Sequence, residues 1–303
     1  MIRKSHFYLY SLLIIAMISC RDNYVILDDN LLGSVSTTQE EIWLDSLCSK
    51  TFAGRRVGTP GHNLAYEYLI SEVKSIGYSP ESVEWVHESG VVLRNIIVPI
   101  DGVVKDSIVI VGAHYDGQYE SDDVTVFQAA NDNGSGVVTS LSILDSLSNM
   151  EYLPRYTTYV CFWDGEEACI SPAFKGSSYF VKHFESIGSI VLYVNIDAMG
   201  HSHDNSLLLG WYGGGTHSRV SCLVDKLIEE RGFNYTLVER NKGEGGSDYV
   251  SFSRAGIPYI SYTDININCE NPIHSTRDTK DVIDYNRLRS VRDLTINVLM
   301  NYL

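Results

Sequence analysis

The sequence predicts an α/β protein, a three-layer sandwich in which a mixed, mostly parallel central sheet is flanked by helices. Two observations carry this prediction. Apolar runs typical of buried strands alternate with stretches of helical spacing along most of the chain. Three of these runs end on His, Asp or Glu, and open α/β sheets bind ligands at the carboxyl ends of their strands.

The first part of the chain is expected to form two helices, a hairpin and a buried strand. The second helix should start at Pro60 and end at Gly77, because proline favours the first helical turn and glycine the residue after the last. Two strand-like runs on either side of Gly90 predict the hairpin. The expected elements are helices over 39–50 and 60–76, and strands near 82–87, 91–99 and 107–113.

The remaining elements alternate between helix and strand, which predicts parallel pairing between helical layers. Glycines open the first of these helices, and its apolar positions (Val137, Val138, Leu141 and Leu144) indicate that it is buried. The expected elements are helices over 134–148, 176–186, 216–231 and 282–302, and strands over 156–163, 189–197, 206–211, 235–239 and 257–262.

Composition is consistent with one large domain and argues against nucleic-acid binding. The chain has 303 residues, of which 44% are hydrophobic and 20% charged, so it has ample material for one α/β core. Its formal charge at pH 7 is −15. Because phosphate binding needs a basic patch, we expect no nucleic-acid partner.

The amino terminus resembles a bacterial lipoprotein signal. Arg3 and Lys4 precede an apolar stretch, and the segment MISC, which ends at Cys20, is similar to the lipobox where signal peptidase cuts before a lipid-modified cysteine. A plain secretory signal or a short membrane anchor is the alternative. The stretch is too short to span a bilayer comfortably, since about 20 apolar residues are needed.

The lipoprotein interpretation divides the chain into three parts. We expect a signal peptide over residues 1–19, a tether over 20–37 that starts with lipidated Cys20, and a folded domain over 38–303. The protein would then be lipid-anchored in the bacterial cell envelope, facing the periplasm or the exterior.

The other cysteines give no sign of a thiolate metal site, because none of them forms a CxxC pair. Cys161 lies within an expected buried strand, where a packed apolar thiol is the usual case. The sequence leaves open whether disulfides form among these cysteines, which are Cys48, Cys161, Cys169, Cys222 and Cys269.

Five segments carry side chains that bind metals. In chain order they are HYD with His114 and Asp116, NDNGSG with Asp132, DGEE with Glu166 and Glu167, NIDAMG with Asp197, and PIHSTRDT with His274. Imidazole and carboxylate groups suit zinc. Each short motif is weak evidence alone, so the order of the set carries the weight. Neither an HExxH helix nor a GxSxG elbow occurs in the chain.

In this order the segments resemble the M28 family of zinc aminopeptidases. The resemblance spans roughly residues 53–290. GRRVGTPGHNLAYEYL is similar to the start of the family's amino-terminal helix, and GGSDYVSFSRAGIPYI is similar to its Ser-Asp segment. The resemblance implies the zinc-exopeptidase fold and a metallopeptidase of the hydrolase class.

The resemblance also implies a site for two zinc ions. His114 and Asp197 would bind one ion, Glu167 and His274 would bind the other, and Asp132 would bridge both. Two-metal hydrolases hold their ions about 3.5–4 Å apart, a spacing that a bridging carboxylate supports.

Residues beside the ligands have implied roles of their own. Asp116, on the same strand face as His114, could accept the second ring N–H of that histidine. Glu166 matches the family's general base, which moves a proton from water to the leaving amine. The bond after Asp132 matches a position where family members have a cis peptide. Ile273 departs from the pattern, since several members have a tyrosine there that steadies the tetrahedral intermediate, so zinc or another donor must replace it.

The function implied by the resemblance is a metal-dependent aminopeptidase that removes residues from peptides with a free N-terminus, using water activated by two zinc ions. One alternative is a single-zinc enzyme similar to glutaminyl-peptide cyclotransferases, which share the zinc-binding residue types and a segment like Gly165–Ala168. Metal count and product mass would discriminate the two. A non-catalytic peptidase-like binding protein is the third interpretation, although such relatives usually lose ligands.

Overall fold

The computed structural model describes residues 37–303 except 168, 170–172, 185–187, 202–207, 214–216, 232–234, 240, 242, 244, 264–271 and 302–303. The predicted signal peptide, Cys20 and all but the last residue of the predicted tether lie outside the described residues. Within the described part, no helix has both the length and the apolar character needed to cross a membrane.

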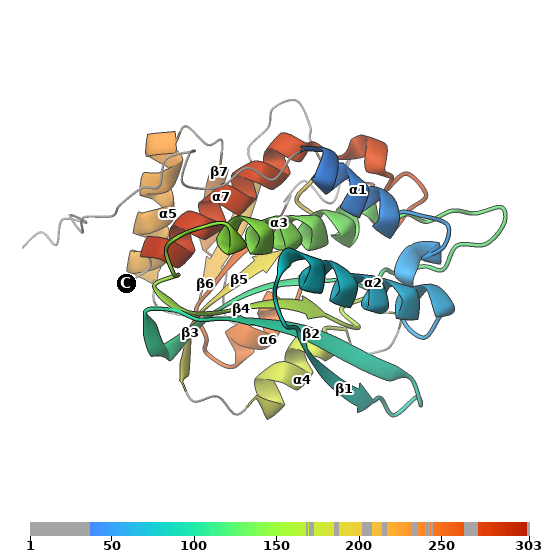
Figure 1. Cartoon of the computed structure of the whole chain (residues 1–303), viewed down its shortest axis with the longest axis horizontal. Coiled ribbons are helices and arrows are strands. Elements are labelled where there is room, and N and C mark those ends of the chain that lie inside the picture. Colours follow the sequence, from blue (N-terminus) through green and yellow to red (C-terminus); the bar gives the residue numbers. More distant parts are fainter. Residues whose placement is uncertain are drawn as a thin grey trace, which may run out of the picture.

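One mixed sheet lies in the middle of the molecule (Figure 1). The described residues form eight strands in the order β1-β2-β4-β3-β5-β8-β6-β7. The central strands β4, β3, β5 and β8 are parallel, as are β6 and β7, whereas β1, β2 and β4 pair antiparallel, as do β6 and β8. The strands are β1 (Glu81–Val86), β2 (Val92–Ile100), β3 (Val104–His114), β4 (Tyr156–Trp163), β5 (Ser189–Ile196), β6 (Leu208–Gly213), β7 (Tyr235–Glu239) and β8 (Tyr259–Thr263).

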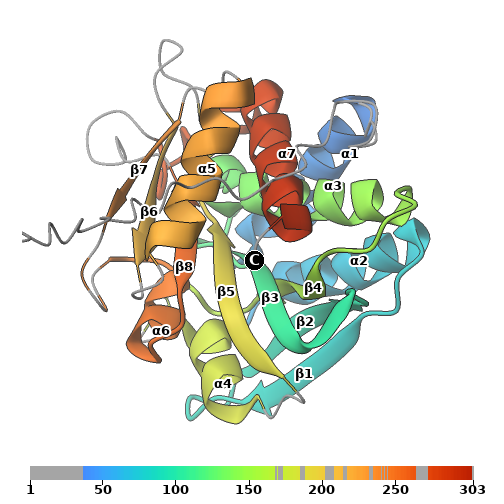
Figure 2. The same ribbon diagram turned by 90° about the vertical axis from the view of Figure 1, so that its left-hand side faces the viewer.

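Helices cover both faces of this sheet. In two perpendicular views, α1, α2, α3, α5 and α7 lie on one face, and α4 and α6 lie on the other (Figures 1 and 2). The predicted three-layer α/β sandwich is therefore confirmed. The helices are α1 (Thr37–Leu47), α2 (Pro60–Ile76), α3 (Gly136–Ser148), α4 (Lys175–His183), α5 (His217–Arg231), α6 (Tyr249–Arg254) and α7 (Tyr285–Asn301).

The central strand β3 shows why the sheet is buried on both sides. Val109 and Val111 belong to the core cluster that includes α3 and α7, whereas Ile108 and Ile110 belong to the opposite cluster with α4 and α6. Successive side chains of a strand point to opposite faces, so a strand covered on both faces needs a continuous apolar run. The run SIVIVGA supplies it.

Local signals in the sequence mark several element ends correctly. Thr59 caps α2 by accepting a hydrogen bond from the backbone N–H of His62, Pro60 begins the helix, and Gly77 ends it in the left-handed conformation. Gly90, at φ +85°, lies in the loop of the predicted hairpin, and β1 and β2 pair antiparallel as expected.

One helix, α6, was not predicted. With six residues it has fewer than two turns, so the sequence offers no helical period to detect. Cys48, Cys161 and Cys169 are free thiols, and Cys161 packs inside β4 as expected. Cys20 and Cys269 lie outside the described residues.

Candidate metal centre

The parallel strands deliver polar side chains to one edge of the sheet. His114 is the last residue of β3 and pairs with Trp163, the last residue of β4. Asp197 directly follows β5, which runs parallel to β3 on its other side. Because parallel strands end at the same edge, the residues that follow β4 also arrive there. This edge is the one that the sequence pattern indicated.

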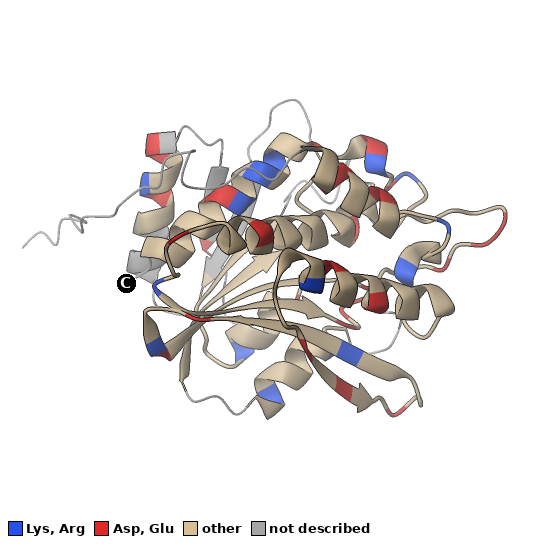
Figure 3. Cartoon of the chain, viewed as in Figure 1, with Lys and Arg blue, Asp and Glu red and all other residues tan. Residues whose placement is uncertain are grey.

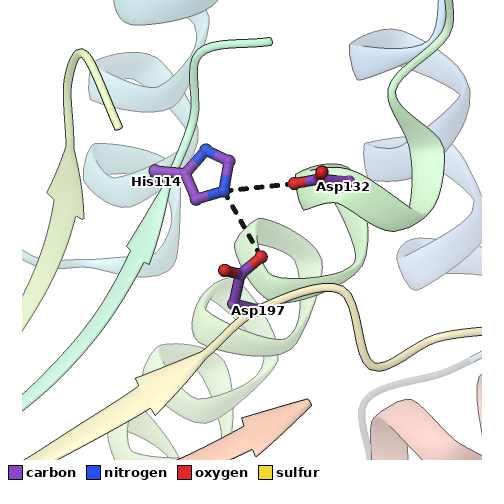
Figure 4. A group of neighbouring side chains, drawn as sticks. All are labelled: His114, Asp132 and Asp197. Atoms are coloured by element: carbon purple, nitrogen blue, oxygen red, sulfur yellow. Dashed lines mark hydrogen bonds and ion pairs between the residues drawn. The ribbon is translucent and has the colours of Figure 1, made fainter. Parts of the chain in front are cut away.

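The first ligand group is buried. The Nε2 atom of His114 lies 3.3 Å from Oδ1 of Asp132 and 3.3 Å from Oδ1 of Asp197 (Figure 4). All three side chains are nearly inaccessible to solvent, and that of His114 is 1% exposed. Histidine nitrogen and carboxylate oxygens converge here from β3, from the segment before α3 and from the end of β5.

The second ligand group shares Asp132 with the first. The Nε2 atom of His274 lies 3.0 Å from Oδ2 of Asp132 and 3.1 Å from Oε2 of Glu167. The side chain of His274 is 44% exposed. The two oxygens of Asp132 thus face different groups, one on each side. The structure brings together all five residues that the family resemblance implied as ligands.

Asp132 is held by its neighbours in the NDNGSG segment. Asn133 donates from its side-chain amide to the backbone oxygen of Ile196, at the end of β5. Asn131 accepts hydrogen bonds from the backbone N–H groups of Gly200 and His201. These contacts place Asp132 beside the residues that follow β5, and the Asp132–Asn133 peptide is cis, as the family resemblance implied.

A carboxylate from the segment after His274 supports the same backbone. Asp278 is buried and accepts hydrogen bonds from the N–H groups of Asn131 (2.6 Å) and Asp132 (3.1 Å). Burial raises the pKa of Asp278 to about 6. Sequence reasoning missed this residue, because an acidic residue in a polar segment carries no distinctive signal.

Asp116 lies beside the ring of His114, as the sequence predicted, and it also contacts the loop after β4. The Nδ1 atom of His114 lies 3.3 Å from the backbone oxygen of Asp116 and 3.6 Å from its carboxylate. The ring nitrogen therefore lies near both the main-chain oxygen and the carboxylate of Asp116. The two carboxylate oxygens accept hydrogen bonds from the backbone N–H groups of Glu166 (3.1 Å) and Glu167 (3.2 Å). Asp116 thus joins the end of β3 to the loop after β4.

Glu166 lies beside the first group. Its Oε2 atom is 3.9 Å from Nε2 of His114, and its side chain is buried. Burial raises the pKa of Glu166 well above its usual value, His114 opposes this, and the carboxylates of Asp197 and Glu167 add to the rise. A carboxyl group in such surroundings holds a proton readily.

The pKa values of the side chains in the second group are strongly shifted. Burial, assisted by the charge of Asp132, raises the pKa of Glu167 to about 7. Hydrogen bonds to Asp132 and Glu167 raise the pKa of His274 to about 11. Burial would raise the pKa of Asp132, but its contacts with His114 and His274 hold it below the usual range. Negative charge is concentrated here beyond what the two histidines offset, which is a setting that attracts cations.

A further buried network supports the two strand ends. Asp164 is the first residue of the DGEE segment. Its Oδ1 atom lies 2.7 Å from Nε2 of His62, and its Oδ2 atom accepts a hydrogen bond from the hydroxyl of Tyr115. The rings of His62 and Tyr115 stack with centroids 5.4 Å apart. Sequence reasoning gave His62 no role, since its partner lies far along the chain and no local motif connects the two.

The protein therefore has an α/β fold, and the two linked ligand groups at one edge of its sheet form a candidate dinuclear metal centre. The model of peptidase family M28 matches residues 95–299, and the chain belongs to this family.

A relative named as an aminopeptidase matches part of the chain. The chain is 27% identical over 172 residues to a protein named probable leucine aminopeptidase 2 from Aspergillus oryzae; the match covers 54% of this chain and 32% of the relative. The chain thus spans about a third of that relative's length.

Solved structures share the fold. A leucine aminopeptidase precursor from Bacteroides thetaiotaomicron is 19% identical, with a TM-score of 0.73 over 89% of this chain and 98% of the other. A glutaminyl cyclase from Fimbriiglobus ruber is also 19% identical, with a TM-score of 0.73 over 88% of this chain and 96% of the other.

Proposed function

We propose that the protein is a metal-dependent aminopeptidase that hydrolyses N-terminal residues from peptides with the help of two zinc ions. The observation that carries the proposal is the shared carboxylate, since the two oxygens of Asp132 face separate ligand groups. Membership of peptidase family M28 and the name of the Aspergillus relative support it.

The residues present fit zinc. Each group offers an imidazole nitrogen and carboxylate oxygens that lie within 4.8 Å of one another. The buried Oε1 atom of Glu167 has no hydrogen-bond partner in the described structure, and a cation would satisfy it. His114 and Asp197 would hold one ion, Glu167 and His274 the other, and Asp132 both. When bound, the ions would acidify a water molecule and polarise the scissile carbonyl.

Glu166 is the residue that we assign to proton transfer. Its carboxylate would take a proton from water and pass it to the leaving amine. Its backbone N–H donates to the buried carboxylate of Asp116, which fixes the main chain on which Glu166 stands. Burial raises the pKa of Glu166, and bound cations would lower it.

The test combines metal analysis with a screen of free and N-acetylated substrates. We expect about two zinc ions per chain and hydrolysis of leucine nitroanilide, but not of its N-acetylated form. A chelator should abolish the activity and added zinc should restore it. Hydrolysis of the acetylated substrate at an equal rate, or activity unaffected by chelation, would contradict the proposal.

A variant pair then tests the role of Glu166. Glu166→Gln should reduce kcat by roughly 10³-fold or more, because it removes the proton acceptor, while the zinc content stays unchanged. Glu81→Gln, on the exposed edge strand β1, is the matched control and should leave kcat unchanged. Full activity of Glu166→Gln would exclude Glu166 as the base.

A glutaminyl-peptide cyclotransferase activity is the second candidate. The similarity in fold to the Fimbriiglobus ruber enzyme favours it. A peptide with N-terminal glutamine separates the two activities, because cyclisation releases ammonia and hydrolysis releases free glutamine. One zinc per chain with a pyroglutamyl product would replace the first proposal. Peptide binding without either product would indicate a non-catalytic binding protein.

We also propose that Cys20 carries a lipid that anchors the protein in the bacterial cell envelope, facing the periplasm or the exterior. The segment MISC and the preceding apolar stretch support this. Expression in a bacterial host with radiolabelled palmitate should label the wild type and place it in the membrane fraction. Cys20→Ser should lose the label. A labelled Cys20→Ser protein would contradict the assignment.

A further inference from the structure

The loop that carries Glu166 and Glu167 is held from two sides through its main chain. Asp116 accepts hydrogen bonds from the N–H groups of both glutamates. On the other side, backbone N–H groups at the start of α4 donate to backbone oxygens of the loop. These bonds run from Gly176 to Asp164 (2.7 Å), from Lys175 to Gly165 (2.8 Å) and from Phe174 to Glu166 (2.9 Å). The loop over residues 164–167 therefore has a defined course between the end of β3 and α4.

Asp164, the first residue of this loop, is anchored through its side chain as well. Its Oδ1 atom lies 2.7 Å from Nε2 of His62 in α2. Its Oδ2 atom accepts hydrogen bonds from the backbone N–H of Arg94 in β2 (2.7 Å) and from the hydroxyl of Tyr115 after β3 (2.9 Å). One buried carboxylate thus joins the loop to a helix and to two strands.

The start of α2 brings His62 to this carboxylate. A Cβ atom at Gly61 would collide with the backbone oxygen of Phe52, so only glycine lets the first turn lie this close to the preceding segment. The ring of His62 stacks on that of Tyr115, with centroids 5.4 Å apart and planes at 5°. Contacts on its face and at its Nε2 atom therefore fix the imidazole. The residues GTPGH, which the proposed function does not use, produce this geometry.

The first turn of α2 offers Asp164 no partner with a permanent charge. It contains no Asp, Glu, Lys or Arg, and the charged residues of α2 lie further along the helix (Figure 3). A buried carboxylate needs hydrogen-bonding partners, because leaving it unpaired in the interior is strongly unfavourable. His62 is the partner of Oδ1, so this contact between α2 and the loop depends on one side chain.

A buried pair of this kind gives position more than stability. Apolar side chains of similar volume, in place of a buried ion pair, often leave the stability of a protein unchanged or raise it. The Nδ1 atom of His62 is also buried and has no hydrogen-bond partner among the described residues, which is a further loss of stability. What the pair provides is a fixed distance between α2 and the main chain two residues before Glu166. A catalytic group benefits from such a fixed position, because small displacements reduce the rate strongly.

We propose that His62 is a positioning residue for proton transfer, which acts through Asp164 to keep the carboxylate of Glu166 beside the metal centre. This inference rests on the aminopeptidase function proposed above. Glu167 is one residue further from Asp164, and zinc would hold its side chain in addition to the hydrogen bond from its N–H to Asp116. Loss of His62 should therefore disturb the base Glu166 more than metal binding.

The first experiment compares two replacements of His62 in the zinc-loaded full chain. His62→Phe keeps a ring against Tyr115 but removes the donor to Asp164. His62→Gln lacks the ring but keeps an N–H donor at a similar reach. With leucine nitroanilide, kcat should fall about tenfold or more in His62→Phe and stay within about threefold of wild type in His62→Gln, while KM and zinc content change little. A wild-type kcat in His62→Phe would overturn the proposal, as would equal losses in the two variants.

A matched control comes from a second histidine that stacks on a tyrosine. His183, exposed at the end of α4, lies with its ring centroid 4.3 Å from that of Tyr179. His183→Phe keeps this ring contact, as His62→Phe keeps the one with Tyr115, and it should leave kcat unchanged. A loss of kcat in His183→Phe equal to that in His62→Phe would show that the effect does not come from Asp164 and would overturn the proposal.

The second experiment asks whether His62 acts through Glu166. In the Glu166→Gln background, the further change His62→Phe should lower kcat by less than about twofold, because the group that it positions is already absent. Urea unfolding should show the same loss of stability from His62→Phe in both backgrounds. A factor in kcat that is equal in both backgrounds would indicate general damage and would overturn the proposal.

Asp164→Asn guards against a failure of His62→Phe to fold, because it keeps the shape of the buried side chain. Its amide has one acceptor oxygen instead of two, so contacts with His62, or with Arg94 and Tyr115, are lost. We expect kcat to fall about threefold or more with zinc content unchanged. A wild-type kcat in this variant would overturn the proposal.

A measurement on the zinc-free protein does not depend on turnover. The N–H groups of Glu166 and Glu167 should exchange slowly with deuterium in wild type, since both residues are buried and both groups are hydrogen-bonded. In His62→Phe, NMR should show them exchanging about tenfold faster or more, because the loop opens more often. Unchanged exchange would overturn the proposal.

The two kinds of result separate this proposal from the proposed function. If wild type cleaves no nitroanilide but the exchange of these N–H groups depends on His62, the aminopeptidase function fails and the role of His62 in holding the loop stands. If wild type is active and His62→Phe equals it in both kcat and exchange, the function stands and the role of His62 fails.

Discussion

The two ligand groups share Asp132 but are enclosed to different degrees. In the first, His114 ends a strand buried on both faces, and its side chain is 1% exposed. In the second, His274 lies in a loop with φ +54°, and its side chain is 44% exposed. Strand ends supply the first group apart from the shared Asp132, whereas the second is completed by a late segment from outside the sheet.

This difference suggests a division of labour around one shared carboxylate. The buried group is fixed by the hydrophobic core, so its geometry depends on the fold as a whole. The open group has the more exposed histidine, so solvent reaches it directly. Substitutions on the two sides should therefore differ in what they disturb.

The largest effect is expected from Asp132→Ala, which removes the one residue common to both groups. We expect zinc content to fall for both ions and kcat/KM to drop by roughly 10³-fold or more. Elemental analysis and initial rates measure this. Asp101→Ala, at a residue with a 78% exposed side chain, is the control. If Asp132→Ala still binds two ions, the carboxylate does not bridge them.

The buried side should also make stability depend on pH. Asp248 is buried, and burial raises its pKa from 3.8 to about 7; His114 and Ser177 oppose this rise, and the charges of Asp197 and Asp116 add to it. A raised carboxyl pKa in the folded state contributes stability below about pH 4, and this contribution is lost as the pH rises through 7. In zinc-free protein the loss should be a few kcal/mol.

Urea unfolding of the zinc-free protein between pH 4 and 8 measures this loss. Asp248→Asn cannot titrate, so its stability should fall less steeply over this range than that of wild type. Identical slopes for the two proteins would show that Asp248 does not hold a proton in the folded state.

His114→Ala and His274→Ala test the difference in enclosure directly. His114→Ala leaves buried carboxylates without their partner and should reduce the free energy of unfolding by about 1–3 kcal/mol in zinc-free protein. His274→Ala, at a half-exposed position, should reduce it by about 1 kcal/mol or less while removing one zinc ion per chain. Denaturant titration with metal analysis measures both. Equal losses of stability in the two variants would contradict the inference that the two groups differ in their dependence on the core.

The smallest effect is expected from Asp116→Asn, which keeps the shape but replaces one acceptor with an amide. One of the two hydrogen bonds from Glu166 and Glu167 is then lost. Zinc affinity should fall about tenfold, as is typical when a residue that orients a ligand is changed. A competition titration with a fluorescent chelator measures the affinity. An unchanged affinity would show that the loop after β4 keeps its position without Asp116.

The sequence was enough to predict the sheet and the edge where the site forms. Parallel strands are nearly continuous apolar runs, so the residues at their ends, His114 and Asp197, could be placed on one edge without coordinates. The meeting of His274 with Glu167 could not be derived from periodicity. It followed only from the order of motifs shared with a family.

Several contacts between side chains and distant parts of the chain could not be predicted from the sequence. Asp116 lies beside the histidine ring as expected, but its carboxylate also accepts hydrogen bonds from two N–H groups of another loop, and nothing in its own segment specifies that partner. The same holds for the pair of His62 with Asp164 and for Asp278. Such partners are far apart in the chain and are set by tertiary packing.

Buried Arg55 clamps the loop between β3 and the NDNGSG segment, because its guanidinium donates to the backbone oxygens of Tyr115 before the loop and of Gln128 and Ala129 at its end. Because the guanidinium holds only main-chain oxygens at the two ends, this clamp does not depend on which side chains lie between them, although Ser121 adds two hydrogen bonds with Phe127 inside the loop. Mutation can therefore exchange the residues at the tip while the frame survives.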